Sequence, residues 1–402
     1  MRKKRSNEDA RRRTSLCGTV IMSLCATLLG ACESSPDDPG RAPNAAVVRE
    51  VVDLGVVEQD ELLIGRDGGY SGSVGDRDVW VFGDTVLAVP DAEAPIWLSN
   101  SWSSTIDRRA DDGLEPLTLG RDAFGEPSEL LPYTEAEEDF NERHRGEDCA
   151  EAPCGARWAL WPGPLVSDDA RGRSLLFYSK IYSEPGPFNF RGVGSSIAVW
   201  SDARTRPSRR ILDEDAAHPT LLFGEDKPAF GAAALIVDDH LHAFACEREE
   251  SIKPCLLARV PLDDALDEDA WEYLDGERRW TSDGGRAAPL FHGSDIMSVA
   301  YNAYLQRFVA VYAEPLGRDI VLRTATRLAG PWSAPVHVAR ALETREPGWV
   351  YDALAHAELE SAEGRTLYVS YTREPPGRSG RELRLLRVEI DLAPRLSERT
   401  SP

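Results

Sequence analysis

The sequence predicts an all-β protein, and within that class a five-bladed β-propeller. From about residue 50 onward, short β-type runs are separated by Gly, Pro, Asp and Asn, and helical periodicity is almost absent. The runs recur in a similar setting, in which a hairpin turn leads into an aromatic-rich strand. We expect central strands of small antiparallel sheets at residues 79–82, 175–178, 196–200, 307–312 and 366–371.

Repeating units of this kind divide most of the chain. Five of them can be counted, near residues 55–110, 155–205, 228–275, 286–340 and 350–395. Blades of this size account for the length as one domain, which we expect over residues 50–396. A pair of two-sheet sandwiches is the alternative architecture. Residues 111–150 and 205–219 are expected to be long inserted loops.

The N-terminus has the pattern of a lipoprotein export signal. Basic residues precede an apolar run from Leu16 to Leu29, and the run ends in the sequence LGAC at Cys32. This run is shorter than the ~20 residues that a membrane-spanning helix needs. We expect residues 1–31 to be removed and Cys32 to carry lipid chains that anchor the protein in the cell envelope, on the periplasmic or the outer face. Plain secretion is the alternative, and Arg11–Arg13 also resembles a twin-arginine signal.

The segment after the signal and the charge of the chain limit the possible partners. Residues 32–49 are polar and broken by Pro and Gly, which predicts a flexible tether behind the lipid. Removal of residues 1–31 takes seven basic and two acidic residues from totals of 46 and 68, leaving 39 against 66 and a net charge of −27. Such a surface repels nucleic acid and anionic membranes, and it also keeps exported proteins soluble. We expect a monomer that contacts the membrane only through its lipid.

The cysteines favour an oxidising compartment. Cys17 and Cys25 leave with the signal, and after lipidation of Cys32 an even number remains, namely Cys149, Cys154, Cys246 and Cys255. Cys246 ends one alternating apolar run and Cys255 begins the next, which predicts a disulfide across that hairpin, with Cys149 and Cys154 as the other pair. A metal site is the alternative, but no His or Cys quartet has zinc spacing. We therefore expect no metal and no cofactor.

Motifs spread through the chain resemble a known family. The first blade has Gly65–Ser71 (GRDGGYS) and Val79–Thr85 (VWVFGDT). Further motifs follow at residues 161–163, 175–178, 230–233, 258–261, 271–273, 297–302, 330–333 and 351–356. Their order and spacing over residues 60–375 are similar to the bacterial domain-of-unknown-function family DUF4185, whose members include endo-D-arabinanases. The resemblance implies a five-bladed propeller and kinship with furanosidases whose active sites lie in the funnel at one end of the propeller axis.

Two acidic residues of the first blade are the candidate catalytic pair. Hydrolysis of a glycosidic bond needs two carboxyl groups that flank it. Asp67 lies in a Gly-bounded loop and Asp84 follows an aromatic strand, and the resemblance matches both to conserved first-blade acids of the family. The chain departs from its active members in having Arg66 before and Gly68–Gly69 after the first Asp. The alternative is that both aspartates are turn residues bonded to backbone.

Four other residues are candidate substrate-binding groups. Trp161 offers an apolar ring face to a sugar, and Tyr301 and Asn302 offer a polar edge. His356 stands in an apolar stretch, where a core histidine is the alternative. Asp295 and Glu314 are candidates for a third carboxylate, with solvated loop acids as the alternative.

The sequence thus predicts a cell-envelope glycoside-hydrolase-like protein that acts on a furanose-containing or other neutral glycan. A catalytically silent glycan-binding lipoprotein and an envelope scaffold are the alternatives. No Gly-x-Ser-x-Gly nucleophile motif with a usable His and acid occurs, and no phosphate-binding loop occurs. The acidic run at residues 262–269 lacks the pattern of a calcium-binding hand.

Overall fold

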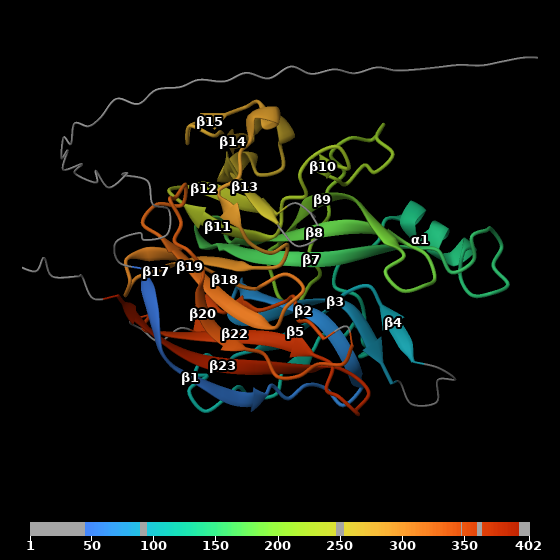
Figure 1. Ribbon diagram of the computed structural model, residues 1–402. Coiled ribbons are helices and arrows are strands. Elements are labelled where there is room, and N and C mark those ends of the chain that lie inside the picture. The colour runs from blue at the N-terminus through green and yellow to red at the C-terminus, as the bar shows by residue number, and fades with distance from the viewer. Residues whose placement is uncertain (1–44, 89–94, 247–252, 347, 360–363, 394–402) are drawn as a thin grey trace, which may run out of the picture. The chain divides into compact units, whose positions relative to one another are not determined.

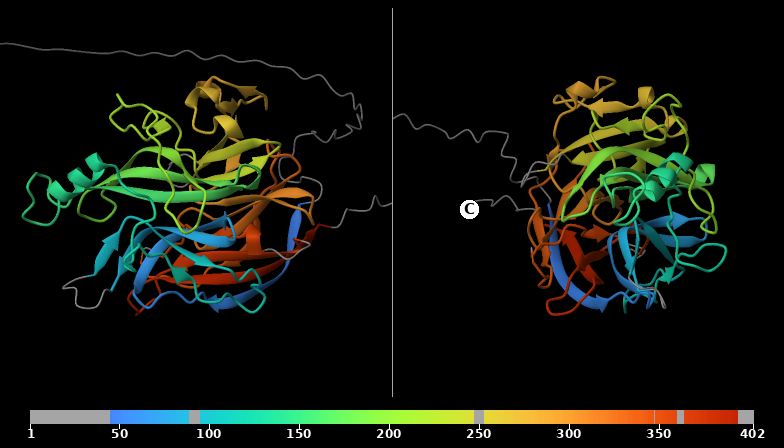
Figure 2. Two further views of the ribbon diagram at one scale, coloured as in Figure 1. Left: turned by 180° about the vertical axis from the view of Figure 1, so that it is seen from behind. Right: turned by 90° about the vertical axis from the view of Figure 1, so that its right-hand side faces the viewer.

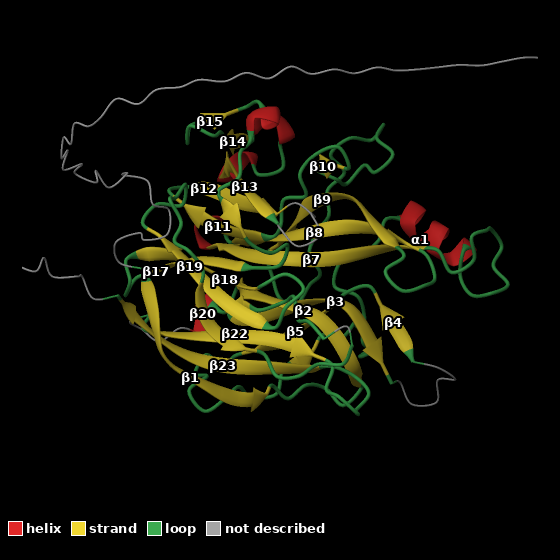
Figure 3. Ribbon diagram, viewed as in Figure 1, coloured by secondary structure: helices red, strands yellow, loops and turns green. Residues whose placement is uncertain are grey.

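The computed structural model describes residues 45–88, 95–246, 253–346, 348–359 and 364–393. Strands dominate these ranges and pair antiparallel, and α1 is the one α-helix within them (Figure 3). The strands form five sheets, which are the blades of a five-bladed propeller, as the sequence predicts. The predicted signal peptide, Cys32 and most of the predicted tether lie outside the described residues. Within the described ranges, no helix is both long and apolar enough to cross a bilayer.

Blades 1 and 2 follow one another along the chain (Figure 1). Blade 1 contains β2 (Leu63–Val74), β3 (Arg77–Leu87), β5 (Ser101–Thr105) and β6 (Thr118–Leu119), and β4 (Ile96–Leu98) also pairs with β3. Blade 2 contains β7 (Arg157–Asp168), β8 (Arg173–Ser183), β9 (Phe190–Trp200) and β10 (Phe223–Gly224).

Blades 3 and 4 have the same up-and-down order. Blade 3 contains β11 (Ala233–Val237), β12 (His240–Cys246), β13 (Pro254–Pro261), β14 (Glu272–Leu274) and β15 (Trp280–Thr281), and β16 (Phe291–His292) pairs with β13. Blade 4 contains β17 (Ser298–Asn302), β18 (Arg307–Ala313), β19 (Asp319–Ala325) and β20 (Val336–Arg340). Short 3₁₀ helices occur at Asp169–Arg171, Leu262–Asp264, Glu268–Ala270, Gly284–Arg286 and Ala357–Leu359.

Blade 5 closes the ring with strands from both ends of the described chain. It contains β21 (Leu354–Ala355), β22 (Thr366–Arg373), β23 (Glu382–Leu392) and β1 (Ala46–Val56). In Figure 1 the blue β1 lies along the red β23, and the two pair from Ala46 opposite Leu392 onward. The predicted boundary at residue 50 is therefore wrong. The tether prediction rested on polarity, but Ala46 is buried in blade 5, where backbone pairing with β23 fixes residues 46–49.

The core consists of apolar clusters between neighbouring blades. Alternate residues of a strand point to opposite faces, so each blade serves two interfaces. In β3, Val79 and Val81 pack toward blade 2, while Trp80 and Phe82 pack toward blade 5. Strands that are buried on both faces read as continuous apolar runs, which is why the sequence marked them as central strands.

The innermost strands of the five blades surround an axial cavity of about 380 Å³. Its lining comes from β2, β7, β11, β17 and β21, together with Glu358 at the end of the last blade's loop. The lining combines small residues such as Gly72 and Ala300 with large ones such as Tyr70 and Tyr301. The ends of these inner strands are the places where a site on the axis would be built.

The insertion before blade 2 contains a helix that the sequence analysis missed. Residues 111–150 were predicted to be a loop, but they include β6 and α1 (Glu135–Arg143). Thr134 and Glu137 form a capping box at the start of α1. The buried Glu137 pairs with Arg209 at 2.7 Å and Lys180 at 2.5 Å, which ties the helix to the green strands of blade 2 (Figure 2). Nine residues are too short for helical periodicity to stand out against the acidic loop.

Candidate active site

A cavity of about 310 Å³ lies at the start of β2 and is named here the carboxylate cavity. Its walls come from three strands of blade 1 and from the loops of blade 5. Asp67 and Asp84 both line it. The two predicted catalytic acids, 17 positions apart in the sequence, therefore open onto the same space.

The pairing of blade 1 explains how these side chains come together. Gly65 stands opposite Val86 in the β2–β3 ladder, and Trp97 of β4 stands opposite Val86 on the other side. Side chains two apart in a strand share a face, so Asp84 and Val86 lie on one face with their cross-strand neighbours. Asp67, two positions after Gly65, lies on the same face. Bulges in β2 at this point change the direction of its side chains.

Asp67 is held by two donors from blade 5. Arg381, on the hairpin between β22 and β23, forms an ion pair with Oδ1, and the Tyr351 hydroxyl donates to Oδ2. Burial raises the pKa of Tyr351 well above its ordinary value, so its hydroxyl stays protonated and donates to the carboxylate. These contacts hold the Asp67 carboxyl group in one orientation.

A glycine makes the approach of Arg381 possible. A Cβ atom on Gly65 would lie 2.9 Å from the backbone N of Arg381, which is closer than such atoms come. The backbone of the β22–β23 hairpin therefore reaches β2 only because residue 65 has no side chain. The Gly-rich motif around Asp67 thus allows close packing of blade 5 against blade 1. The motif lies inside β2, so the prediction that Asp67 belongs to a loop is wrong.

Asp84 has a different environment. Burial raises its pKa to about 6, against the lowering effects of a hydrogen bond from Trp161 and of the Arg157 charge. The Trp161 indole Nε1 donates to Oδ1 of Asp84 at 3.0 Å. A carboxyl group with a pKa near 6 is protonated in about a tenth of the molecules at pH 7 and in a larger fraction at lower pH, which suits it to donate a proton.

The two carboxyl groups therefore have opposite tendencies in one cavity. The Asp67 carboxyl group has a cation and a hydroxyl donor as partners, whereas burial raises the pKa of Asp84 to about 6. Paired carboxyls whose environments separate their protonation states are the arrangement that acid–base cleavage requires.

Trp161 lies next to this pair, but the other predicted binding residues do not. Tyr301 of β17 lines the axial cavity and is 54% exposed. Asn302 is buried. It accepts from the Leu305 backbone in the β17–β18 turn and donates to the Gly364 carbonyl before β22 at 2.6 Å, so both ends of its amide have structural partners. Tyr301 therefore belongs to the axial lining and Asn302 to the fold, and neither lines the carboxylate cavity.

His356 is a core histidine. Its ring stacks on Trp80 with centroids 4.0 Å apart, and its two nitrogens contact the hydroxyls of Ser71 and Ser370 at 2.6 and 2.7 Å. Burial lowers its pKa to about 3, so it is neutral over the ordinary pH range. The substrate-binding prediction for His356 is therefore not supported by its position, because side chains and not solvent surround both nitrogens.

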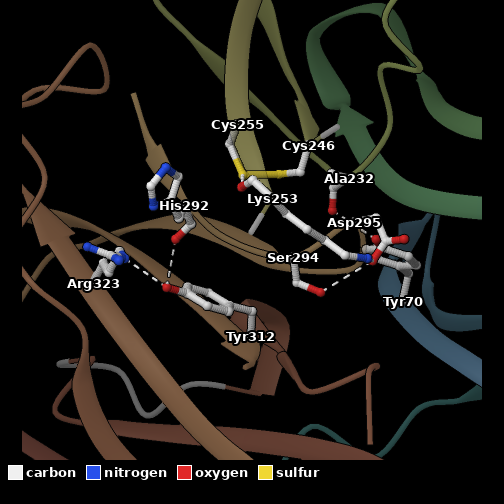
Figure 4. The surroundings of a disulfide bond; sticks show 10 residues. All are labelled: Tyr70, Ala232, Cys246, Lys253, Cys255, His292, Ser294, Asp295, Tyr312 and Arg323. Carbon is white, nitrogen blue, oxygen red and sulfur yellow. Dashed lines mark hydrogen bonds and ion pairs between the residues drawn. A yellow bond between two sulfur atoms is a disulfide. The ribbon is translucent and has the colours of Figure 1, made fainter. Parts of the chain in front are cut away.

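The two extra carboxylates differ in their surroundings. Glu314 is exposed on the β18–β19 hairpin. Asp295 accepts from Lys253 Nζ at 2.6 Å, and Figure 4 shows Lys253 extending past the Cys246–Cys255 disulfide to Asp295 beside Tyr70. Asp295 also contributes to the negative field that raises the pKa of Tyr70, after burial itself.

Both predicted disulfides are present. Cys246 and Cys255 stand directly opposite each other at the end of the β12–β13 ladder, and Cys149 is bonded to Cys154. Among the residues that the structure describes, no group of three or more His, Cys, Asp or Glu side chains is arranged to hold a metal ion.

Sequence reasoning missed several residues of the cavity. Arg381, Arg345 and Glu374 come from loops of blade 5, about 300 positions from Asp67, and Trp97 comes from the short β4. Tyr351 and Asp352 were part of a recognised motif but had no assigned role. Asp352 is fully buried and accepts from Gly68 N at 3.1 Å and from Thr372, which braces blade 5 against blade 1. The motif at residues 351–356 was the feature of the sequence that could have identified Tyr351 and Asp352 as residues near the site.

Comparisons with solved structures found several proteins at low identity. An α-L-arabinofuranosidase from Podospora anserina, solved with cellotriose, has 8% identity and a TM-score of 0.46, with 85% of this chain and 97% of that chain covered. A GH43_1 enzyme from Xanthomonas citri has 10% identity and a TM-score of 0.45, with 83% and 89% covered. An exo-β-1,3-galactanase from Phanerochaete chrysosporium has 12% identity and a TM-score of 0.46, with 84% and 64% covered. The comparison with curated proteins found no match.

A family comparison matches residues 197–385 to DUF4185, described as a domain of unknown function. The matched residues run from β9 to β23 and include the blade 5 groups that hold Asp67, while Asp67 and Asp84 themselves precede them. The resemblance seen in the sequence motifs is thereby confirmed, and the chain carries a DUF4185 domain within a five-bladed β-propeller.

Proposed function

We propose that this protein is a glycoside hydrolase that cleaves a neutral, furanose-containing glycan in the carboxylate cavity. The observation that carries the proposal is that Asp67 and Asp84 line one open cavity with opposite environments. The family resemblance, which includes endo-D-arabinanases, supports the choice of a furanose-containing substrate.

The roles of the two acids follow from their surroundings. Asp84, with its pKa raised to about 6 by burial, protonates the oxygen of the leaving sugar. Asp67, which is oriented by its contact with Arg381, is the partner carboxylate at the anomeric carbon. A separation of about 5–5.5 Å between the carboxyls makes that partner a nucleophile and retains configuration, whereas about 6.5–9.5 Å admits a water and inverts it.

The proposal also includes the cellular location of the protein. We propose that the mature chain is held at the cell envelope by lipid on Cys32, which brings the cavity to extracytoplasmic glycans. Two disulfides among the described residues agree with an oxidising compartment.

A catalytically silent glycan-binding protein is the second candidate. It is favoured by one observation, namely that both oxygens of Asp67 already have protein donors. A binding protein needs the cavity and its aromatic residues but not a reactive carboxylate.

Isosteric substitutions separate these candidates. We expect the unchanged protein to release reducing sugar from an arabinan within a panel of neutral polysaccharides, and we expect Asp67→Asn and Asp84→Asn each to abolish that release. Asp239→Asn is the matched control, because Asp239 is an exposed aspartate of the β11–β12 turn, away from the cavity. Activity that survives both site substitutions contradicts the assignment, and binding without turnover by the unchanged protein supports the second candidate.

A further inference from the structure

Trp97 is an aromatic side chain in the wall of the carboxylate cavity that has no role in the chemistry described above. It is the central residue of the three-residue strand β4 and stands opposite Val86 of β3. Both residues line the cavity, and Asp84 lies two positions before Val86 on the same strand face. The ring is half-buried, so part of it is accessible from the cavity.

Arg157, the first residue of β7, is stacked on this ring. Its guanidinium carbon lies 3.1 Å from the centroid of the Trp97 ring. Its Nε is buried and has no hydrogen-bond partner within the described part of the chain. The cation is stabilised by the ring as well as by the charge of Asp84, and it holds the indole in one orientation.

The charged residues of the cavity largely neutralise one another. Asp67 pairs with Arg381, and Glu374 pairs with Arg345 at 2.8 Å and with Arg381 at 3.1 Å. A ligand with its own charge would have to displace one of these pairs, which costs free energy. An uncharged ligand with an apolar face leaves all of them in place.

From these contacts we infer that Trp97, held by Arg157, is the platform on which an uncharged sugar ring stacks inside the carboxylate cavity. The inference rests on the proposed function, because the stacked ring would lie beside Asp67 and Asp84. It makes Trp97 a binding residue and Arg157 a positioning residue that acts through Trp97.

The arrangement has a physical reason. One face of the indole is covered by the guanidinium, so the ring offers its remaining surface to a ligand. The C–H face of a sugar ring is apolar and matches an indole surface, while its hydroxyls stay at the edge for polar groups. A ring fixed before binding loses little conformational freedom when the ligand arrives, which favours affinity.

Affinity electrophoresis of the full-length chain tests the inference. The gels contain arabinan as the neutral probe or polygalacturonate as the acidic probe, and the variants are Trp97→Ala, Trp97→Phe and Arg157→Gln. Trp280→Ala is the matched control, because Trp280 is also half-buried and also has an arginine, Arg259, stacked at 4.3 Å, but lies on β15 of blade 3. Circular dichroism checks that each variant folds.

We expect Trp97→Ala to weaken arabinan binding at least about tenfold, because it removes a central aromatic contact. Trp97→Phe should retain most of the affinity, Arg157→Gln should show an intermediate loss, and Trp280→Ala should bind like the unchanged protein. If Trp97→Ala binds arabinan as tightly as the unchanged protein does, Trp97 is not the platform. Tighter retention by polygalacturonate than by arabinan, or no retention of the unchanged protein by arabinan, also overturns it.

The same variants show whether the stacking platform or the proposed hydrolase activity is wrong. Asp84→Asn tests hydrolysis without removing the platform, so Trp97-dependent binding with no turnover keeps the platform and rejects the hydrolase. Turnover that requires Asp84, with a KM that Trp97→Ala leaves unchanged, rejects the platform and keeps the hydrolase.

Discussion

Trp161 of blade 2 donates its indole N–H to the Asp84 carboxylate of blade 1 across 3.0 Å. The bond crosses the interface between two blades and stabilises the charged form of an acid that burial drives toward neutrality. The pKa of about 6 is therefore a balance between tertiary packing and one hydrogen bond.

Loss of this bond should raise the pKa of Asp84 further. In Trp161→Phe the ring keeps its apolar bulk but has no N–H, so the ionised carboxylate loses a donor. We expect an increase of about one pH unit, since a hydrogen bond to a charged group is worth about 1.5–3 kcal/mol before solvent compensates part of it. Carboxyl NMR titration measures the change, with Trp158→Phe as the control. A pKa that stays at its original value contradicts the role of Trp161.

His356 should make the protein less stable in acid. Its pKa is about 3 in the folded protein and about 6.5 when unfolded. The unfolded state therefore binds the extra proton first, and the stabilisation that is complete above pH 6.5 is lost as pH falls toward 3.

The variant His356→Gln does not titrate and separates this effect from other groups. Between pH 6.5 and 4, the free energy of unfolding should fall less in the variant than in the unchanged protein, by roughly 3 kcal/mol. Urea unfolding at several pH values gives the two slopes. Equal slopes would show that His356 contributes no proton uptake on unfolding.

The Cys246–Cys255 disulfide should stabilise blade 3. The double substitution Cys246→Ser and Cys255→Ser opens a short loop, and we expect the free energy of unfolding to drop by about 2–3 kcal/mol. The corresponding change at Cys149 and Cys154 is the control, because that bond closes a loop in the insertion outside the blades. Thermal unfolding of both double variants provides the comparison, and an unchanged midpoint for the blade 3 variant rejects the prediction.

Membrane attachment should depend on Cys32. In Cys32→Ser no thiol is available for lipid, so the protein should move from the membrane fraction to the soluble fraction and should not incorporate labelled palmitate. Cys25→Ser, which changes a cysteine inside the predicted signal, is the matched control and should stay with the membrane. Soluble protein in both cases would favour plain secretion.

Particular residues show which features of the fold can be predicted from the sequence. Val79–Phe82 and Thr366–Tyr371 are apolar enough to be recognised as central strands, because burial on both faces leaves a continuous run in the sequence. Cys246 and Cys255 were paired correctly, because a hairpin places the ends of adjacent strands together. Residues 46–49 were misassigned although Ala46, Val47 and Val48 are apolar, because the polar, Pro- and Gly-broken segment before them was extended too far along the chain.

The amino-acid pattern alone predicts the all-β class, the number of blades, the disulfides and Asp67 and Asp84 as the candidate acids. Each of these depends on local pattern or on neighbours along the chain. The tertiary structure alone decided that Arg381, Tyr351 and Trp97 surround those acids and that His356 and Asn302 are parts of the fold. Closure of the ring brings residues some 300 positions apart into contact. The burial of these side chains, and the pKa shifts that burial causes, depend on that contact and cannot be predicted from local sequence.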